Sequence, residues 1–179
     1  MTLLPLSGRA RVLGDDVDTD AIVSSRRKKD SIDPDQLRRF LLEGIDANFA
    51  STVRHGDILV AGRNFGCGSA MEVAATVVKA AGFAAVIAGS FSRTYLRNAI
   101  NNGLLPLTAD TSDIREGDPL HLSINPAGTP ELRIGASGPI RCEPLPGWMW
   151  TMLEVGGLVP YLRQHGRFAA PGAPPPPLA

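Results

Sequence analysis

The chain has 179 residues, of which 44% are hydrophobic and 20% are charged, and 18 Lys and Arg residues balance 18 Asp and Glu residues. This composition is typical of a chain with material for one hydrophobic core, and the net charge gives no reason to expect nucleic acid as a partner. Two cysteines are too few for a disulfide framework, no apolar stretch reaches the roughly 20 residues of a membrane span, and the N-terminus lacks a signal-peptide pattern, so we expect a cytoplasmic protein without membrane contact.

The first strand is expected at residues 8–13, and a segment rich in charged side chains follows it. Residues 14–22 carry four carboxylates, but they lack the glycine and the terminal glutamate of an EF-hand loop. The basic run Ser24-Ser25-Arg26-Arg27-Lys28-Lys29 comes next. It is either a solvated face or a clamp that binds a substrate carboxylate through charge-assisted hydrogen bonds.

A helix is expected at residues 33–42, with Asp33 as the N-cap and Pro34 at the first helical position. The next strand is expected at residues 57–61. The most informative stretch of the chain, residues 62–72 (GRNFGCGSAME), separates this strand from a helical pattern at residues 72–81. Its glycines allow positive φ and a close approach of the backbone to a ligand.

Two interpretations of Ser69 follow from this turn. In the functional interpretation, the N–H groups at the start of the helix hold an anion, and the Ser69 hydroxyl faces the ligand. In the structural interpretation, Ser69 is the N-cap and Glu72 completes a capping box. The flanking glycines favour an active-site turn, because a plain cap does not need them.

Cys67 is a second candidate in the same turn, because a helix N-terminus lowers the pKa of a thiol. A cysteine nucleophile also needs a histidine base, and His55, His121 and His165 carry no supporting motif. Two distant cysteines and three scattered histidines give no zinc-ligand spacing. No metal-binding motif and no phosphate-binding loop is expected in this chain.

A strand is expected at residues 84–88, and Ser90 to Leu104 follows it with a helix at residues 94–101 that stops at Gly103. This places Ser92 and Arg93 at a helix N-terminus, on the same carboxyl edge of the sheet as Ser69. The alternative is a helix with surface arginines.

The remaining expected elements are strands at residues 120–124 and 131–134 and a helix at residues 148–153. The alternation of strand and helix in the middle of the chain indicates right-handed βαβ units and a parallel sheet, with a mixed sheet or small barrel beside them. The predicted fold class is therefore α/β. One domain is expected over residues 1–167, and residues 168–179 are expected to form a disordered Pro-rich tail.

Several separated motifs, in the right order, resemble those of 3-isopropylmalate dehydratase small subunits, the free-standing form of the aconitase swivelling domain. The matching motifs are Asp18-Thr19-Asp20-Ala21-Ile22, residues 62–72, residues 90–104, Pro144-Leu145-Pro146 and residues 156–162. The resemblance covers about residues 8–163. It implies an aconitase-like swivelling domain, with a mixed or parallel sheet of βαβ units flanked by helices.

The resemblance also implies a division of labour in a hydro-lyase. A separate large subunit, in a heterodimer or heterotetramer, would carry a 4Fe-4S cluster, and this chain would bind no cofactor. Ser69 would be the base that removes a carbon-bound proton from a 2-hydroxy di- or tricarboxylate. The other residues expected to bind or position the substrate are Thr19, Asp20, Arg26, Arg27, Gly66, Cys67, Gly68 and Arg93.

Two departures from the family pattern bear on the substrate. The family usually has Ser-Arg after the serine base, where this chain has Ala70 and Met71, and a thioether cannot pair with a carboxylate. The loop after Ile22 replaces a Pro-x-Arg-Tyr-Leu-like run with the basic run, whose cations could supply the missing charge. The alternatives are a related hydratase of another di- or tricarboxylate, a non-catalytic partner domain, and a Cys67-dependent enzyme.

Overall fold

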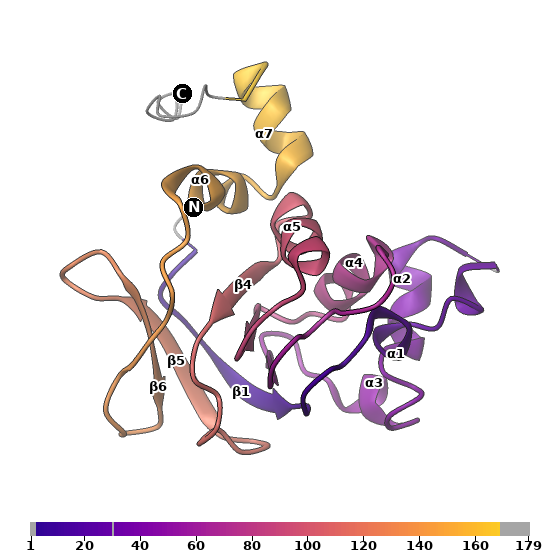
Figure 1. Ribbon diagram of the computed structural model, residues 1–179, viewed down its shortest axis with the longest axis horizontal. Helices are drawn as coiled ribbons and strands as arrows, with labels where there is room; N and C mark the ends of the chain where they lie inside the picture. Colours follow the sequence, from indigo (N-terminus) through magenta and orange to yellow (C-terminus); the bar gives the residue numbers. More distant parts are fainter. Residues whose placement is uncertain (1–2, 30, 169–179) are drawn as a thin grey trace.

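The computed structural model describes residues 3–29 and 31–168, and seven strands within these residues form one sheet (Figure 1). The strands are β1 (Leu6–Val12), β2 (Ile58–Ala61), β3 (Ala85–Ala88), β4 (Leu105–Thr108), β5 (Pro119–Ile124), β6 (Pro130–Ile134) and β7 (Ile140–Arg141). Their order across the sheet is β4-β3-β2-β1-β5-β6-β7. Strands β1 to β4 are parallel, whereas β5, β6 and β7 continue from the other side of β1 in antiparallel fashion.

The helices of the described residues are short and lie mainly between the parallel strands in sequence. They are α1 (Thr19–Ile22), α2 (Pro34–Leu37), α3 (Phe49–Thr52), α4 (Val73–Ala80), α5 (Arg93–Asn101), α6 (Gly147–Glu154) and α7 (Leu158–His165), with 3-10 helices η1 (Arg27–Lys29) and η2 (Arg38–Phe40). The expected βαβ units are thereby confirmed, since α4 connects β2 to β3 and α5 connects β3 to β4.

The expected mixed sheet is also confirmed, but it is not a separate barrel. The antiparallel strands extend the parallel ones through β1, whose residues 6–9 pair with β5 and whose residues 10–12 pair with β2. After β7 the sheet curls back on itself, because the Glu143 N–H donates to the Thr108 carbonyl of edge strand β4 at 2.8 Å. Figure 1 shows the β5–β6 hairpin turned away from the helices.

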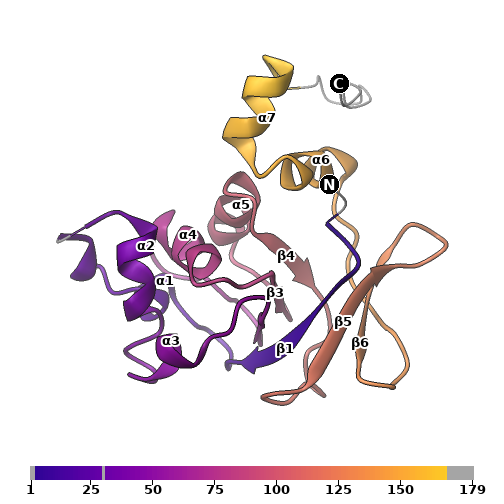
Figure 2. The ribbon, with the colours of Figure 1, turned by 180° about the vertical axis from the view of Figure 1, so that it is seen from behind.

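Buried apolar side chains cover both faces of the sheet. One cluster joins β2 and β3 to α2 and α4 through residues such as Leu37, Leu59 and Val78. The other joins the sheet to α5, α6 and α7 through residues such as Met152 and Tyr161. Figures 1 and 2 show α1 to α4 on one side of the molecule and α6 and α7 beyond α5.

The single helix expected over residues 33–42 is wrong in its second half. Asp33 caps α2 as expected, accepting from the Asp35 N–H at 3.0 Å, but α2 ends at Leu37 and continues only as η2. The chain turns at Leu42, at φ +57°, and the Leu42 N–H donates to the Ile22 carbonyl and not to a carbonyl of a continuing helix. Leu41 and Leu42 are both fully buried at this turn.

Strand β4 and helix α7 were not expected, because each contains a proline. Pro106 is tolerated because β4 is an edge strand, where a missing N–H breaks no ladder bond. Pro160 lies in the first turn of α7, where the N–H groups have no intrahelical partner. The expected tail at residues 168–179 lies outside the described residues except for Phe168, whose ring is 6.0 Å from that of Tyr161.

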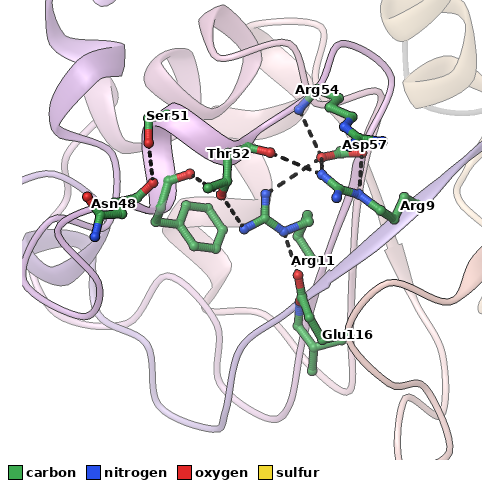
Figure 3. Close-up of polar contacts among 10 residues, drawn as sticks. Arg9, Arg11, Asn48, Ser51, Thr52, Arg54, Asp57 and Glu116 are labelled. Atoms are coloured by element: carbon green, nitrogen blue, oxygen red, sulfur yellow. Dashed lines mark hydrogen bonds and ion pairs between the residues drawn. The ribbon is translucent and has the colours of Figure 1, made fainter.

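A buried ion network fastens α3 to the sheet (Figure 3). The Arg9 guanidinium donates to both carboxylate oxygens of Asp57, at 3.2 and 2.7 Å, and Arg11 Nη1 lies 3.7 Å from the same carboxylate. Arg11 also donates to Thr52 Oγ1 at 2.9 Å and to Glu116 at 2.7 Å. Arg11 and Asp57 are only 5% and 3% exposed, whereas the side chains of Arg9 and Glu116 are 31% and 56% exposed. The network therefore joins β1, α3 and the residue before β2, and its centre is shielded from water.

Within the described part of the chain, none of the helices has the length and apolar character needed to cross a bilayer.

Candidate active site

The loops that follow β1, β2 and β3 meet at one edge of the sheet. Asp18 and Cys67 form an isolated parallel bridge, and the Thr19 N–H donates to the Cys67 carbonyl at 2.9 Å. Phe65 and Phe91 form a second bridge on the other side of the glycine turn. Parallel strands end at the same edge of a sheet, so the three motifs that are far apart in the sequence form one continuous site.

The glycine turn has the backbone conformation that its sequence predicted. Gly66 and Gly68 have φ of +74° and +84°, in the left-handed region that favours glycine. A Cβ atom on Gly66 would collide with the Cβ, Cγ and Cδ2 atoms of Tyr95. Tyr95 is 1% exposed, stacks on Phe91 and meets Phe65 edge-on at 4.9 Å between ring centroids. An aromatic cluster thus supports the turn from below.

Replacing Gly66 by alanine is expected to lower the free energy of unfolding by about 2–4 kcal/mol. The left-handed conformation and the collision with the Tyr95 ring both contribute to this loss. Gly128→Ala is the matched control, because Gly128 also has positive φ (+79°) but open space at its Cβ position. Chemical denaturation of the two variants would measure the difference, and equal losses would contradict the proposed contact with Tyr95.

Ser69 does not cap helix α4, so the capping-box interpretation is wrong. The N-cap of α4 is Glu72, without a side-chain hydrogen bond, and the helix begins at Val73. The Ser69 carbonyl oxygen accepts from Thr19 Oγ1 at 2.9 Å and from the Met71 N–H at 2.8 Å. Ser69 is exposed, and its hydroxyl has no partner among the described residues.

The backbone next to Ser69 also offers unpaired donors. The N–H groups of Gly68, Ser69 and Ala70 donate to no acceptor in residues 3–29 and 31–168. Successive free N–H groups around a residue with positive φ form a concavity that attracts anions. The expected donors at the first turn of α4 are therefore replaced by donors of the turn itself, because the helix starts four residues after Ser69.

Met71 points into the protein, whereas Ala70 is exposed. The Met71 residue is 5% exposed and belongs to the apolar cluster that contains the buried residues of α4. A thioether is compatible with this environment, whereas a charged side chain would need a partner there. Any cation that serves this end of the site therefore has to come from another segment.

The Cys67 thiol does not have the lowered pKa expected of a nucleophile. Burial raises its pKa above 9.0, and the nearby carboxylates of Asp18 and Asp16 raise it further. The thiol lies 3.5 Å from the Asp16 carbonyl oxygen, which it can only approach as a donor. At neutral pH the group is protonated, and this disfavours a cysteine-centred mechanism.

The basic run lies beside α1 and divides into residues with different environments. Arg27 is engaged: its guanidinium donates to both oxygens of Glu43, each at 2.8 Å, and its Cζ lies 3.8 Å from the Phe40 ring centroid. Arg26 is exposed and lines a cavity of about 670 Å³ together with Asp20 and Ile45. Arg26 and Arg27 both line this cavity, and within the described residues Arg27 forms an ion pair whereas Arg26 forms none.

Thr19 and Asp20 hold the loops in place. Asp20 accepts from the Ser25 N–H at 2.7 Å, and this bond is the main reason why the pKa of its carboxyl is below 3.8. Arg93 is the first residue of α5 and is exposed, and the Ser92 before it caps the helix and donates to the Gly66 carbonyl at 2.6 Å. The sequence placed Ser92 at the helix start. It did not predict the hydrogen bond from Ser92 to the glycine turn, which the tertiary structure shows.

No group of three or more His, Cys, Asp and Glu side chains in the described residues is arranged to hold a metal ion. A separate cavity of about 680 Å³ opens where β1 to β4 end, and it is lined by Arg63 and Asp15 but by none of residues 64–72. Arg63 and Asp15 pair with each other at 2.8 Å, so they stabilise the loops next to the glycine turn.

Comparison with known sequences finds one matching protein family and several similar small-subunit proteins. The aconitase C-terminal domain family matches residues 20–112. The methanogen homoaconitase small subunit of Methanocaldococcus jannaschii is 43% identical over 161 residues, which are 89% of this chain and 92% of that protein. The 3-isopropylmalate dehydratase small subunit 1 of Methanopyrus kandleri is 40% identical over 93% of this chain and 98% of its own length.

Comparison with solved structures finds a protein of the same kind. The crystal structure of 3-isopropylmalate dehydratase from Methanocaldococcus jannaschii superposes with a TM-score of 0.84 at 43% sequence identity. The match covers 91% of this chain and 96% of the crystallised one. The α/β architecture with its mixed sheet is thus that of an isopropylmalate dehydratase small subunit.

Proposed function

The chain belongs to the aconitase C-terminal domain family, and from this premise we propose that it is the small subunit of a hydro-lyase that isomerises a 2-hydroxy dicarboxylate. The glycine turn carries this proposal. In the part of the chain that the structure describes, its Ser69 hydroxyl and three adjacent backbone N–H groups have no hydrogen-bond partner, and an aromatic cluster packs beneath it. These features suit a base that becomes negatively charged during the reaction.

In the proposed reaction, Ser69 Oγ removes a proton from the carbon next to the hydroxyl-bearing carbon. The electron pair of the broken C–H bond forms a carbon–carbon double bond, and the hydroxyl group leaves as hydroxide, which takes a proton from solvent to become water. Addition of water to the alkene diacid with the opposite orientation, with Ser69 returning the proton, gives the isomer. The free N–H groups of Gly68, Ser69 and Ala70 stabilise the alkoxide form of Ser69, which is otherwise a weak base.

The partner in this proposal is a large subunit that carries a 4Fe-4S cluster. The cluster supplies a Lewis acid for the departing hydroxyl group. This chain supplies the base, the anion-binding backbone and the walls of the substrate site. The relatives' designation as small subunits supports such a partner, and their full-length similarity supports a chain that docks as one unit.

The substrate proposed first is a malate with an alkyl branch, as the isopropylmalate dehydratase relatives suggest. A second candidate is a tricarboxylate, because Arg26 offers a cation to the 670 Å³ cavity and one relative is a homoaconitase small subunit. Thr19 and Asp20 position the loops in either case, and the exposed Arg93 is a second cation for a substrate carboxylate. The raised pKa of Cys67 argues against a cysteine-dependent enzyme.

The test is reconstitution with the large subunit under anaerobic conditions, followed by turnover assays with 3-isopropylmalate and homoisocitrate. We expect a stable complex and formation of the alkene diacid, measured by its ultraviolet absorbance. Turnover by the small subunit alone would contradict the division of labour. A cluster-loaded complex that turns over neither compound, nor other 2-hydroxy di- and tricarboxylates, would favour a non-catalytic partner domain.

A further inference from the structure

The loop after β1 and the loop after β2 run side by side between the sheet and the proposed site. Strands β1 and β2 pair in parallel, and the segments that follow them stay paired beyond the strands. The Gly62 N–H donates to the Gly14 carbonyl at 3.1 Å, and the Asp16 N–H donates to the Arg63 carbonyl at 2.8 Å. The loop after β1 therefore supports the beginning of the turn that carries Ser69.

Both loops change direction at one pair of residues, Asp16 and Asn64. Their φ angles are +55° and +59°, in the left-handed region that favours glycine, and two of the three non-glycine residues with positive φ in the described residues are this pair. Asp and Asn tolerate this conformation better than other side chains, but it is still less favourable for them than an ordinary one. The contacts around the pair must therefore hold it in place.

The side chains of the pair are hydrogen-bonded to each other. Asn64 Nδ2 donates to Asp16 Oδ1 at 2.8 Å, and the Asn64 N–H donates to Ser90 Oγ at 2.8 Å. Asn64 thus links the loops that follow β1, β2 and β3. A glycine would adopt the same φ more easily, but it has no side chain that could bond to Asp16.

The anchored part of the turn ends where the free donors of the site begin. Beyond Asn64, the Gly66 N–H donates to the Val17 carbonyl at 2.8 Å. Further along, the N–H groups of residues 68–70 have no acceptor in the part of the chain that the structure describes. Two glycines with positive φ lie in this stretch, and glycine leaves the backbone many conformations. The direction of the Ser69 hydroxyl therefore depends on how the turn is anchored.

We propose that Asn64 is a positioning residue for the proposed base and acts through its hydrogen bonds to Asp16 and Ser90. It holds the glycine turn so that the Ser69 hydroxyl and the free N–H groups face the substrate together. This inference rests on the proposed function of Ser69. A misplacement of about 1 Å at a reacting group can lower a rate about 10²-fold, so a residue that does not contact the substrate can still determine kcat.

The first experiment compares Asn64→Gly with the wild type in the reconstituted complex, with 3-isopropylmalate as substrate. Glycine permits the positive φ and adds no charge, so the variant removes the side-chain bond to Asp16. We expect kcat to fall about 10-fold or more, with KM within about twofold, because no substrate contact is removed. Unchanged kcat would overturn the proposal, since Asn64 would then serve only to permit the positive φ.

Asn125→Gly is the matched control for this experiment. Asn125 lies in the turn between β5 and β6, and its Oδ1 accepts from the Ala127 N–H at 3.0 Å. The control variant therefore also exchanges an asparagine for glycine and loses a side-chain hydrogen bond, but away from the glycine turn. Its kcat and KM should equal those of the wild type. An equal fall in kcat for both variants would overturn the proposal.

A reciprocal exchange tests the bond between the two side chains. Asn64→Asp places two carboxylates opposite each other without a donor, so kcat should fall at least as far as with Asn64→Gly. In the double variant Asp16→Asn/Asn64→Asp, donor and acceptor change places, and both residue types still tolerate positive φ. Its kcat should return to within about threefold of the wild type. A double variant no more active than Asn64→Asp would overturn the proposal.

Hydrogen exchange separates this inference from the proposed function, because it needs neither a partner nor turnover. In the full chain, the Gly66 amide hydrogen should exchange about 10-fold faster with Asn64→Gly than in the wild type, whereas the amides of β3 should keep their rates. Equal rates at Gly66 would contradict the anchoring by Asn64, and the proposal would fail. If the reconstituted complex turns over no 2-hydroxy acid, the proposed function fails, and the exchange rates alone decide whether Asn64 anchors the turn.

Discussion

Replacing Ser69 by alanine is expected to lower kcat of the reconstituted enzyme by about 10²–10⁴-fold, the usual contribution of a general base. The substitution should leave the turn intact, because the hydrogen bonds of Ser69 within the described residues use its carbonyl oxygen. Alanine keeps that oxygen, so the free energy of unfolding should change by less than about 0.5 kcal/mol. KM should change little, since the hydroxyl acts in the transition state.

Ser137→Ala provides the matched control for this prediction. Ser137 is also an exposed serine in a turn, but it lies between β6 and β7, away from the glycine turn. Its replacement should leave kcat and KM unchanged. If Ser69→Ala retains wild-type kcat while the complex is intact, the base is another group.

Replacing Asp57 by asparagine is expected to lower the free energy of unfolding by about 3 kcal/mol, because it removes the buried carboxylate that pairs with Arg9 and leaves buried Arg11 with Glu116 as its one counter-ion among the described residues. Asp57 is 3% exposed and pairs with Arg9 at 2.7 Å and Arg11 at 3.7 Å. For a domain of this size the melting temperature should fall by roughly 6–12 °C. Asp113→Asn, at an exposed position in the loop before β5, should change it by no more than a degree or two.

The pH dependence of this difference follows from the pKa of Asp57. Burial raises that pKa, but the hydrogen bonds from Arg9 and the Arg54 N–H and the charges of Arg9 and Arg11 outweigh burial and hold it below 3.8. A folded-state pKa below the unfolded value means that the stabilisation is complete above about pH 4 and is lost as the pH falls further. The melting temperatures of the wild type and Asp57→Asn should therefore converge below about pH 4. A constant difference down to pH 3 would contradict the contribution of the ionised carboxylate.

The glycine turn was predictable because its constraints are local. Gly66 and Gly68 have the positive φ that glycine permits, and the surrounding strand and helix patterns place the turn at the carboxyl edge of a parallel sheet. The family resemblance follows from motifs of the same kind, and the relatives confirm it.

The roles of the basic loop were not predictable, because they depend on contacts distant in sequence. Arg27 is engaged by Glu43, which is 16 residues away, and Lys28 reaches a cavity whose other wall is formed by residues 70–73. In the sequence these residues belong to one basic run. Tertiary packing places them in separate environments.

The sequence by itself therefore determined the βαβ core, the positions of the turn glycines and the family, since these depend on short-range periodicity and on backbone conformations that few residues adopt. Only the tertiary structure decided that Ser69 is free of α4, that Met71 is buried and that the helix after Asp33 ends early. Each of these outcomes depends on contacts with distant segments, as when the Leu42 N–H bonds to the Ile22 carbonyl where the helix has ended. Burial and long-range pairing outweigh local propensity at such positions, because the free energy of packing a side chain exceeds the small differences between local conformations.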